Sequence, residues 1–308
     1  MAGGAPSGRA SPGAGPAHCP AVNPVAMNSR PPGPGRLVFA GEVRYFDAMD
    51  FTRIVYTSGQ RAATITLNRP EKRNAMDDLM VRELSTAFSM AAKDPDARVI
   101  VLTANGSSFC AGADLGYLGR VASYDHDENL QDSSRLAHLY RIMYEMRKPI
   151  IAVVDGPAIA GGCGLASACD FIIAGREHAR FGYSEVRIGF IPAIVMVFLV
   201  KRVGEGRARE LVLRGNVLTA EEAVSAGLAS LVVPSAELES ATKMLVDELS
   251  TQNSPMAMSL CKELLSKLQG MNFPDALEFA SNMNAAARMT ADCKRGIAAF
   301  LKKETITW

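Results

Sequence analysis

Two short loops of small residues are the parts of this sequence best suited to chemistry. The stretches CAGAD (residues 110–114) and AGGCG (residues 160–164) each follow an apolar run and precede an expected helix. Glycines just before a helix leave backbone N–H groups accessible and let a ligand approach closely. The helix dipole adds partial positive charge there. Two such loops together can therefore hold an oxygen atom that becomes negatively charged during a reaction.

A carboxylate follows the second loop at a spacing that suits a general base. Glu185 comes after a Phe-Gly turn and before a strongly apolar run, residues 188–200. Partial burial there would raise its proton affinity, as a general base requires. The alternative is a surface acid paired with Arg187, and each loop alone can equally be a packing turn, with Asp114 as a helix cap. The three features together favour a catalytic site.

Other kinds of site fit the sequence less well. Gly162-x-Gly164-x-x-Ser167 approaches the dinucleotide-binding pattern, with Glu185 near the distance of a ribose-binding acid. However, the residues PAIA separate the first glycine from the preceding apolar run, and Glu185 does not end such a run. The four histidines show no metal-ligand spacing, and no GxSxG motif occurs. We therefore expect neither a dinucleotide cofactor, a metal site nor Ser-His catalysis.

Composition limits the partners and the location. The chain has 308 residues, a net charge of +1 and no long run of one sign, so neither nucleic acid nor a membrane surface is an expected partner. Its six cysteines form no CxxC pair, which is typical of reduced thiols in the cytoplasm. The apolar run 188–200 contains Pro192 and is too short to span a bilayer, so it predicts a core helix.

The pattern along the chain predicts three parts. Residues 1–48 are rich in Gly, Pro, Ala and Ser and are expected to be a disordered extension. Their acid-poor composition faintly resembles a transit peptide, which would place the protein in an organellar matrix, although a start at Met49 is favoured. Residues 49–245 alternate strand-like and helical segments, which predicts an α/β core. Residues 246–308 predict a helical C-terminal arm.

Five segments in order resemble the enoyl-CoA hydratase/isomerase (crotonase) superfamily from about Phe51 to the C-terminus. They are LNRPEKRNAM, SSFCAGADL, KPIIAVVDGPAIAGGCGLASACDFIIA, ARFGYSEVRIGFIP and LTAEEAVSAGLASLVVP. The resemblance implies an α/β, crotonase-like spiral of ββα units with a helical C-terminal arm, assembled as a homotrimer or a dimer of trimers. It also implies an acyl-CoA substrate, with coenzyme A as part of that substrate and no separate cofactor.

The resemblance also implies roles for individual residues. Ala111 and Gly161 would donate the two N–H groups of an oxyanion hole, and Glu185 would be the acid/base group. The substrate-binding positions that it implies lie in the RNAM turn and the two loops: Arg73, Ala75, Gly112, Ala113, Asp114, Leu115 and Gly164.

One position departs from the pattern of many hydratases in this superfamily. Those hydratases carry a second glutamate three residues after the oxyanion-hole glycine, where this chain has Gly164. A single glutamate suffices for the alternative activity, a Δ3,Δ2-enoyl-CoA isomerase. The segments GGCGLASACDF and YSEVRIGFIPAIV, however, most resemble those of methylglutaconyl-CoA hydratase-type members. We therefore predict an enoyl-CoA hydratase over the isomerase, and both over a non-catalytic acyl-CoA-binding protein, against which Glu185 argues.

Overall fold

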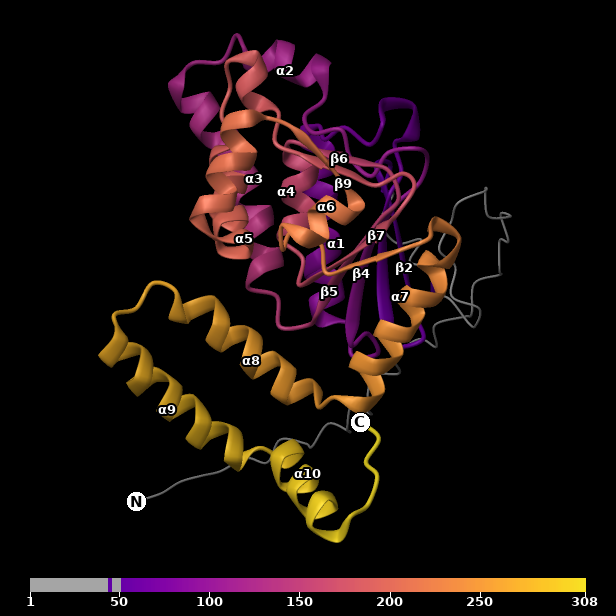
Figure 1. Ribbon diagram of the computed structural model, residues 1–308, viewed down its shortest axis with the longest axis vertical. Helices are drawn as coiled ribbons and strands as arrows, with labels where there is room; N and C mark the ends of the chain where they lie inside the picture. The colour runs from indigo at the N-terminus through magenta and orange to yellow at the C-terminus, as the bar shows by residue number, and fades with distance from the viewer. Residues whose placement is uncertain (1–43, 46–50) are drawn as a thin grey trace, which may run out of the picture. The chain divides into compact units, whose positions relative to one another are not determined.

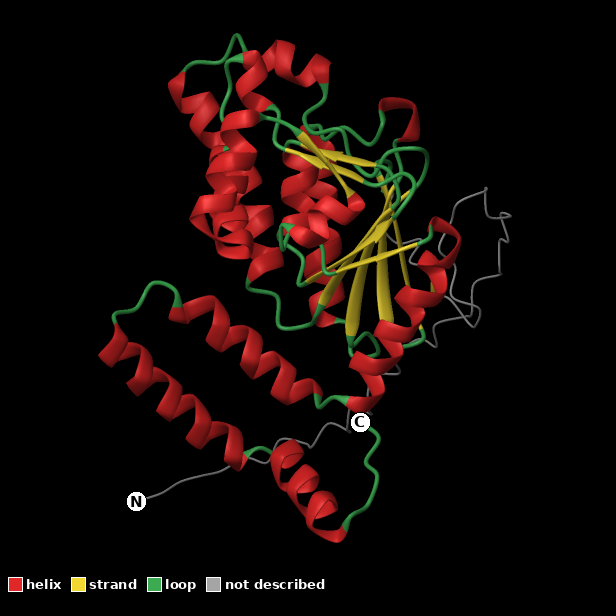
Figure 2. Ribbon diagram, in the orientation of Figure 1, coloured by secondary structure: helices red, strands yellow, loops and turns green. Residues whose placement is uncertain are grey.

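A seven-stranded sheet forms the centre of the computed structural model, which describes residues 44–45 and 51–308 (Figures 1 and 2). Its first three strands are antiparallel, and from the third strand onward neighbouring strands are parallel. In spatial order the strands are β1 (Arg44–Tyr45), β2 (Ile54–Gly59), β3 (Ala62–Leu67), β4 (Val99–Ala104), β5 (Ile150–Val154), β7 (Phe171–Gly175) and β10 (Leu231–Val233).

Helices cover both faces of this sheet, which explains why its strands are continuous apolar runs. Successive side chains of a strand point to opposite faces. In β4, Ile100 and Leu102 join the larger core cluster, while Val99 and Val101 join the smaller one. The larger cluster receives side chains from α1 (Asp78–Lys93), α3 (His126–Tyr144), α4 (Gly161–Ser167) and α5 (Ala193–Arg214), and the smaller one from α7 (Leu238–Asp247).

A second, three-stranded sheet lies where the two predicted loops begin. It contains β6 (Pro157–Ile159), β8 (Arg180–Gly182) and β9 (Val217–Thr219). Two isolated bridges, Met76 with Ala113 and Cys110 with Ala158, connect the RNAM turn, the first loop and β6. The short elements are helices α2 (Leu115–Val121) and α6 (Ala220–Ser225), the 3-10 turns Pro70–Lys72, Glu185–Ile188 and Ser235–Glu237, and a π-helical turn, Glu248–Gln252.

The structure moves both predicted boundaries of the core. Residues 1–48 lie outside the described residues apart from β1, which pairs with β2 and so extends the core ahead of residue 49. At the other end, position 246 falls inside α7, and Val246 and Leu249 are buried in the smaller core cluster. The helical arm therefore begins with α8. Its helices, none of which has a buried residue, are α8 (Pro255–Leu268), α9 (Phe273–Met289) and α10 (Ala291–Lys302).

The apolar run at 188–200 becomes a core helix only in part. Pro192 stands at the N-cap, so α5 begins at Ala193 and the preceding apolar residues remain in a turn. Val195 and Leu199 are buried, whereas Phe190 is 61% exposed. Only the inner face of α5 therefore belongs to the core. Within residues 44–45 and 51–308, no helix combines the length and the apolarity that a membrane span requires.

Candidate active site

The two predicted loops lie against each other. A Cβ atom at Gly112 would be 3.1 Å from both Cβ of Ala160 and the carbonyl oxygen of Ile159, and 3.8 Å from the nitrogen of Gly161. The Ile159 N–H donates to the carbonyl of Cys110, at 2.9 Å. Gly112 has φ +91, a conformation that side chains with a Cβ rarely adopt. Glycine is thus required here on two grounds, and it lets the loops converge.

The predicted donor Ala111 is already engaged in a hydrogen bond. Its N–H donates to the carbonyl of Arg73, at 3.0 Å. That bond ties the RNAM turn to the first loop, and Arg73 itself is exposed at the left-handed end of the turn. An N–H group that stabilises the loop in this way is not free to bind a thioester oxygen. The structure therefore argues against Ala111 as an oxyanion donor.

Ala113, two residues later, presents an exposed N–H group. In its bridge with Met76, the bonds run from the Met76 N–H to the Gly112 carbonyl and from the Asp114 N–H to the Met76 carbonyl, at 2.7 and 2.9 Å. The N–H of Ala113 itself therefore faces away from the bridge. It has no hydrogen-bond partner among the described residues, and Ala113 is exposed.

Gly161, the second predicted donor, lies at the start of a helix. It is the first residue of α4, where a helical N–H has no partner within the helix. No acceptor for its N–H occurs in residues 44–45 and 51–308. The preceding residue, Ala160, has φ 53 and ψ −125, which is a strained conformation for a residue with a Cβ. This conformation turns the chain sharply out of β6 and into the helix.

Glu185 is a buried carboxyl group close to the second loop. Glu185 is the first residue of the 3-10 turn after β8, and only 8% of the residue is exposed. Its Oε2 atom has no hydrogen-bond partner in the described part of the chain. Burial raises the pKa of the Glu185 carboxyl, and a hydrogen bond from its own backbone opposes this only in part. Burial is the main cause that raises the pKa values of Tyr140 and Cys163, and the nearby Glu185 charge raises both further. An orphaned carboxylate oxygen near the helix that begins with the Gly161 N–H suits proton transfer at a carbonyl compound.

This arrangement agrees with the comparison to known protein families. The model of the enoyl-CoA hydratase/isomerase family matches residues 57–308. The chain belongs to that family. Enzymes of the family take coenzyme A as part of the substrate and need no separate cofactor. In the described residues of this member, no group of His, Cys, Asp and Glu side chains is arranged to hold a metal ion.

Individual relatives support the same family and the same fold. A Thermus thermophilus protein assigned as an enoyl-CoA hydratase is 42% identical over 78% of this chain and 94% of its own length. The 2,3-dehydroadipyl-CoA hydratase of Escherichia coli is 34% identical over 82% of this chain and 97% of its own. The crystal structure of an enoyl-CoA hydratase from Shewanella pealeana superposes with a TM-score of 0.79, at 30% identity, covering 84% and 97% of the two chains. The crotonase-like fold is thereby confirmed.

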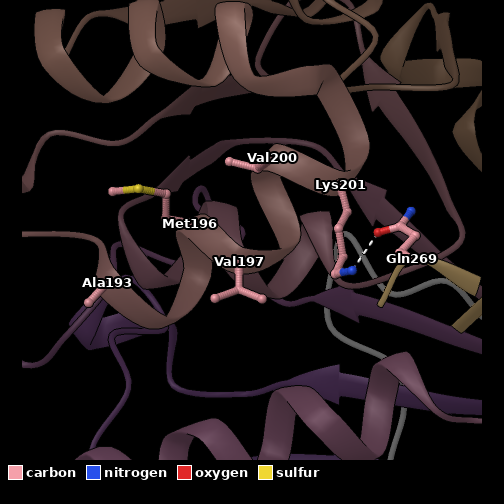
Figure 3. A pocket seen from close by; sticks show the side chains of 6 residues that line it. All are labelled: Ala193, Met196, Val197, Val200, Lys201 and Gln269. Atoms are coloured by element: carbon pink, nitrogen blue, oxygen red, sulfur yellow. Dashed lines mark hydrogen bonds between the residues drawn. The ribbon is translucent and has the colours of Figure 1, made fainter. Parts of the chain in front are cut away.

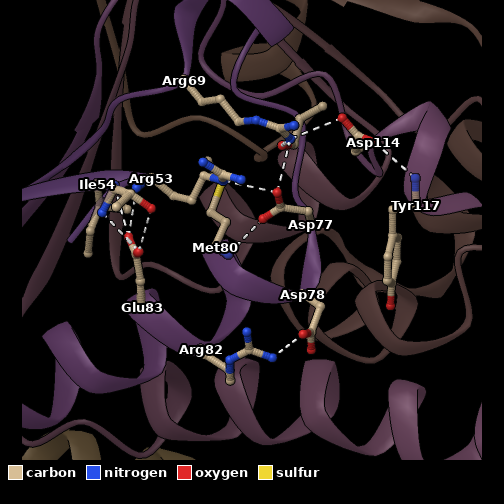
Figure 4. Close-up of polar contacts among 12 residues, drawn as sticks. Arg53, Ile54, Arg69, Asp77, Asp78, Met80, Arg82, Glu83, Asp114 and Tyr117 are labelled. Carbon is tan, nitrogen blue, oxygen red and sulfur yellow. Dashed lines mark hydrogen bonds and ion pairs between the residues drawn. The ribbon is translucent and has the colours of Figure 1, made fainter. Parts of the chain in front are cut away.

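Asp114 of this family member uses its side chain for structure. It accepts from the Tyr117 N–H, at 2.9 Å, to cap α2, and it pairs with Arg69, at 3.0 Å (Figure 4). Burial acts against ionisation, but these two partners outweigh it and hold the pKa of Asp114 below its usual range. Arg69 also donates to the carbonyl of Ala75, at 3.0 Å. The polar groups of Asp114 and Ala75 therefore stabilise the loops, whereas Leu115, 84% exposed, is free to contact a ligand.

Gly164 is buried rather than part of a substrate surface. A Cβ atom there would lie 2.1 Å from Cγ1 of Val195 and 3.2 Å from the hydroxyl of Tyr140. The predicted substrate contact at Gly164 lacks an exposed surface in this structure, because α5 packs directly on this position. For the same reason, a glutamate at 164 cannot be accommodated unless Val195 moves.

Asn74 is a residue of the RNAM turn whose structural role the local sequence does not predict. Its side-chain amide donates to the carbonyls of Asn105 and Ser108, both at 2.8 Å, and its oxygen accepts from the Arg69 N–H. Asn74 is fully buried at φ 53, a conformation that asparagine tolerates better than most residues. It fixes the turn against the segment that leads into the first loop.

A separate hollow lies on the outer face of α5. Its volume is about 570 Å³, and Ala193, Met196, Val197, Val200, Lys201 and Gln269 line it (Figure 3). At 100° per residue, this face of α5 points away from Val195, which contacts Gly164. Lys201 and Gln269 close one end with a hydrogen bond. The hollow includes none of the candidate catalytic residues.

Proposed function

We propose that this family member is an enoyl-CoA hydratase that adds water across the 2,3 double bond of an acyl-CoA thioester. The observation that supports it best is the buried Glu185 carboxyl with an unpartnered oxygen, together with N–H groups at Ala113 and Gly161 that have no acceptor in the described residues, on two loops that lie against each other. The names of the relatives favour hydration over other reactions of the family. In this proposal the thioester carbonyl oxygen accepts hydrogen bonds from both N–H groups.

In this mechanism one carboxylate carries out both proton transfers of the addition. Glu185 takes a proton from water as the water oxygen forms a bond to the β carbon. The electrons of the double bond move to the thioester oxygen, where Ala113 and Gly161 stabilise the enolate. The protonated Glu185 then gives its proton to the α carbon, which restores the carboxylate. A raised pKa suits both steps, since the group must accept and release a proton near neutral pH.

The acyl group is proposed to be branched and to carry a terminal carboxylate, as in 3-methylglutaconyl-CoA of leucine breakdown. The resemblance of GGCGLASACDF and YSEVRIGFIPAIV to that subgroup supports this, as does the dicarboxylic acyl group named for the Escherichia coli relative. Exposed Ile188 and Phe190 lie in the turn that begins at Glu185 and just after it, and the Phe190 N–H donates to the Glu185 carbonyl. These side chains give the acyl group an apolar neighbour suited to a methyl branch.

The second candidate is a Δ3,Δ2-enoyl-CoA isomerase. It is favoured by the packing of Val195 on Gly164, which leaves no room for a second glutamate at that position. Moreover, no other described carboxylate contributes to the raised pKa of Glu185. One carboxylate is enough to move a proton between the α and γ carbons.

Product analysis in ¹⁸O-labelled water separates the two activities. We expect the purified full-length chain to hydrate 3-methylglutaconyl-CoA, to hydrate crotonyl-CoA more weakly, and to place the label on the β carbon. Mass spectrometry of the thioester products measures this directly. Conversion of a 3-enoyl-CoA to its 2-enoyl isomer, with no label in any product, would replace the hydratase with the isomerase.

The C-terminal arm is proposed to be covered by other copies of the chain in a homotrimer or a dimer of trimers. Its helices have no buried residue, and Phe273, Met289 and Phe300 are each more than 70% exposed. Exposed apolar surface of this extent is typical of subunit contacts. We expect light scattering to give the mass of three or six copies of the 32.9 kDa chain. The mass of a single copy would contradict the proposal.

The cytoplasm is the proposed location. Cys110, Cys163, Cys169, Cys261 and Cys293 are all free thiols, as in a reducing compartment. An organellar matrix is the alternative if residues 1–48 contain a transit peptide, and most of that segment lies outside the described residues. Cell fractionation distinguishes the two.

A further inference from the structure

We infer that Tyr140 is a positioning residue that holds the Gly161 N–H in place for catalysis. The inference rests on the proposed enolate chemistry but not on which product the enolate gives. Tyr140 lies on α3, outside both loops, and its hydroxyl donates to the carbonyl of Gly161, at 2.7 Å. It thus acts on the oxyanion donor through the backbone of the same residue.

The helix that carries this donor has little support of its own. α4 spans only seven residues, and three of its first four are glycines. Each glycine weakens a helix by about 1 kcal/mol relative to alanine. The N-cap residue, Ala160, has no side chain able to cap the helix. In this first turn, the Ser167 hydroxyl of the same helix donates to the carbonyl of Cys163, and the Tyr140 hydroxyl from another helix donates to the carbonyl of Gly161.

The strained residue before Gly161 makes this support necessary. Ala160 keeps its φ of 53 with its N–H donated to the carbonyl of Gly182, at 2.7 Å. A strained backbone persists only where the surrounding contacts hold it. The bond to Gly182 fixes the peptide group before Ala160, and the bond from Tyr140 fixes the peptide group after Gly161. Without the hydroxyl, the peptide between Ala160 and Gly161 can rotate to relieve the strain, and the N–H then loses its direction.

Tyr140 is suited to this role and unsuited to acid–base catalysis. It is fully buried, and burial, followed by the neighbouring Cys110, Cys163 and Glu185, raises the pKa of its hydroxyl well above the ordinary value. The hydroxyl therefore stays protonated at working pH, and its one proton is committed to Gly161. Its ring packs on Phe198, with the centroids 5.5 Å apart, which fixes the side chain.

Tyr140→Phe keeps the ring and deletes only the hydroxyl. We expect kcat to fall at least about tenfold with KM within about threefold, because the oxyanion contact strengthens as the enolate forms. The acid limb of the pH profile, set by Glu185, should stay in place. Bound acetoacetyl-CoA gives a readout without turnover, since it loses its C2 proton to form an enolate with its own ultraviolet absorbance. The pH at which this enolate appears should rise by about one unit, which equals a tenfold loss of stabilisation.

Tyr144→Phe is the matched control. Tyr144 lies one turn further along α3, is half-buried, and also packs on Phe198, at 5.6 Å. We expect this variant to keep wild-type kcat and enolate ionisation. A wild-type kcat together with wild-type enolate ionisation in Tyr140→Phe would overturn the inference. A shift of the acid limb of its pH profile would also overturn it, because that result would assign Tyr140 to proton transfer.

A second variant and a second reaction keep the test decisive. If Tyr140→Phe does not fold, Phe198→Leu loosens the ring that carries the hydroxyl and leaves the Ala160–Gly161 turn unchanged. Weaker enolate ionisation in Phe198→Leu than in Tyr144→Phe supports the inference, and wild-type ionisation overturns it. If the wild-type chain isomerises and does not hydrate, the proposed function fails, but the comparison of Tyr140→Phe with Tyr144→Phe is then made on isomerisation.

Discussion

Glu185→Gln is expected to lower turnover by at least about a hundredfold while affinity for the CoA thioester stays close to wild type. Glutamine has nearly the same shape, but it can neither accept the proton from water nor return one to the α carbon. Steady-state kinetics and calorimetric binding of a saturated acyl-CoA measure the two effects. Glu205→Gln is the matched control, because Glu205 is an exposed glutamate paired with Arg209 on α5.

The pH dependence follows from the raised pKa of Glu185. Only the ionised carboxylate can take a proton from water, so activity is lost as the pH falls through this raised pKa. We expect the acid limb of kcat to lie above the ordinary glutamate value of 4.5 in the wild-type chain and in Glu205→Gln. Turnover of Glu185→Gln at the wild-type rate would remove Glu185 from the mechanism.

The same substitution is expected not to lower stability at neutral pH. Because burial raises the folded-state pKa of this acid, the folded state binds more protons than the unfolded state between the unfolded and folded pKa values. Stability is therefore lost as the pH rises through that window. Glu185→Gln removes this loss of stability, so its thermal midpoint at neutral pH should equal or exceed that of wild type. In acid, where the wild-type carboxyl is protonated, the two thermal midpoints should converge.

Replacing the Ala113 amide by an ester, through incorporation of lactic acid at that position, is expected to lower kcat by about a hundredfold. The change deletes one N–H and keeps the side chain. Loss of a single oxyanion-hole donor typically costs about 3 kcal/mol in the transition state. Because the Ala113 N–H has no partner in the described structure, the free energy of unfolding should change little. Kinetics and thermal unfolding of the same sample measure both.

The same ester at Ala111 is the control that separates the two candidate donors. It deletes the hydrogen bond to the Arg73 carbonyl, so we expect a lower thermal midpoint and a much smaller effect on kcat. The opposite pattern, with turnover lost at 111 and kept at 113, would restore Ala111 as the oxyanion donor.

The sequence by itself determined the ingredients of the site. The apolar runs that became β4 and β5 are visible because burial on both faces leaves a local record in composition. The glycines of both loops are visible because tight turns and helix starts demand particular residue types locally. Glu185 stood out because a carboxylate between a turn and an apolar run is unusual. The segments around these residues were enough for the correct family and the correct fold.

Only the tertiary structure decided which groups of those segments are free to act. The Ala111 amide is occupied because Arg73, 38 positions earlier in the chain, folds against it, and nothing in the local sequence CAGAD reveals that bond. Val195 fills the space at Gly164, and Tyr140 reaches Gly161 from another helix. Local patterns record the conformation and burial of each segment. The pairing of one backbone N–H with one acceptor depends on contacts between distant segments, and these exist only once the chain has folded.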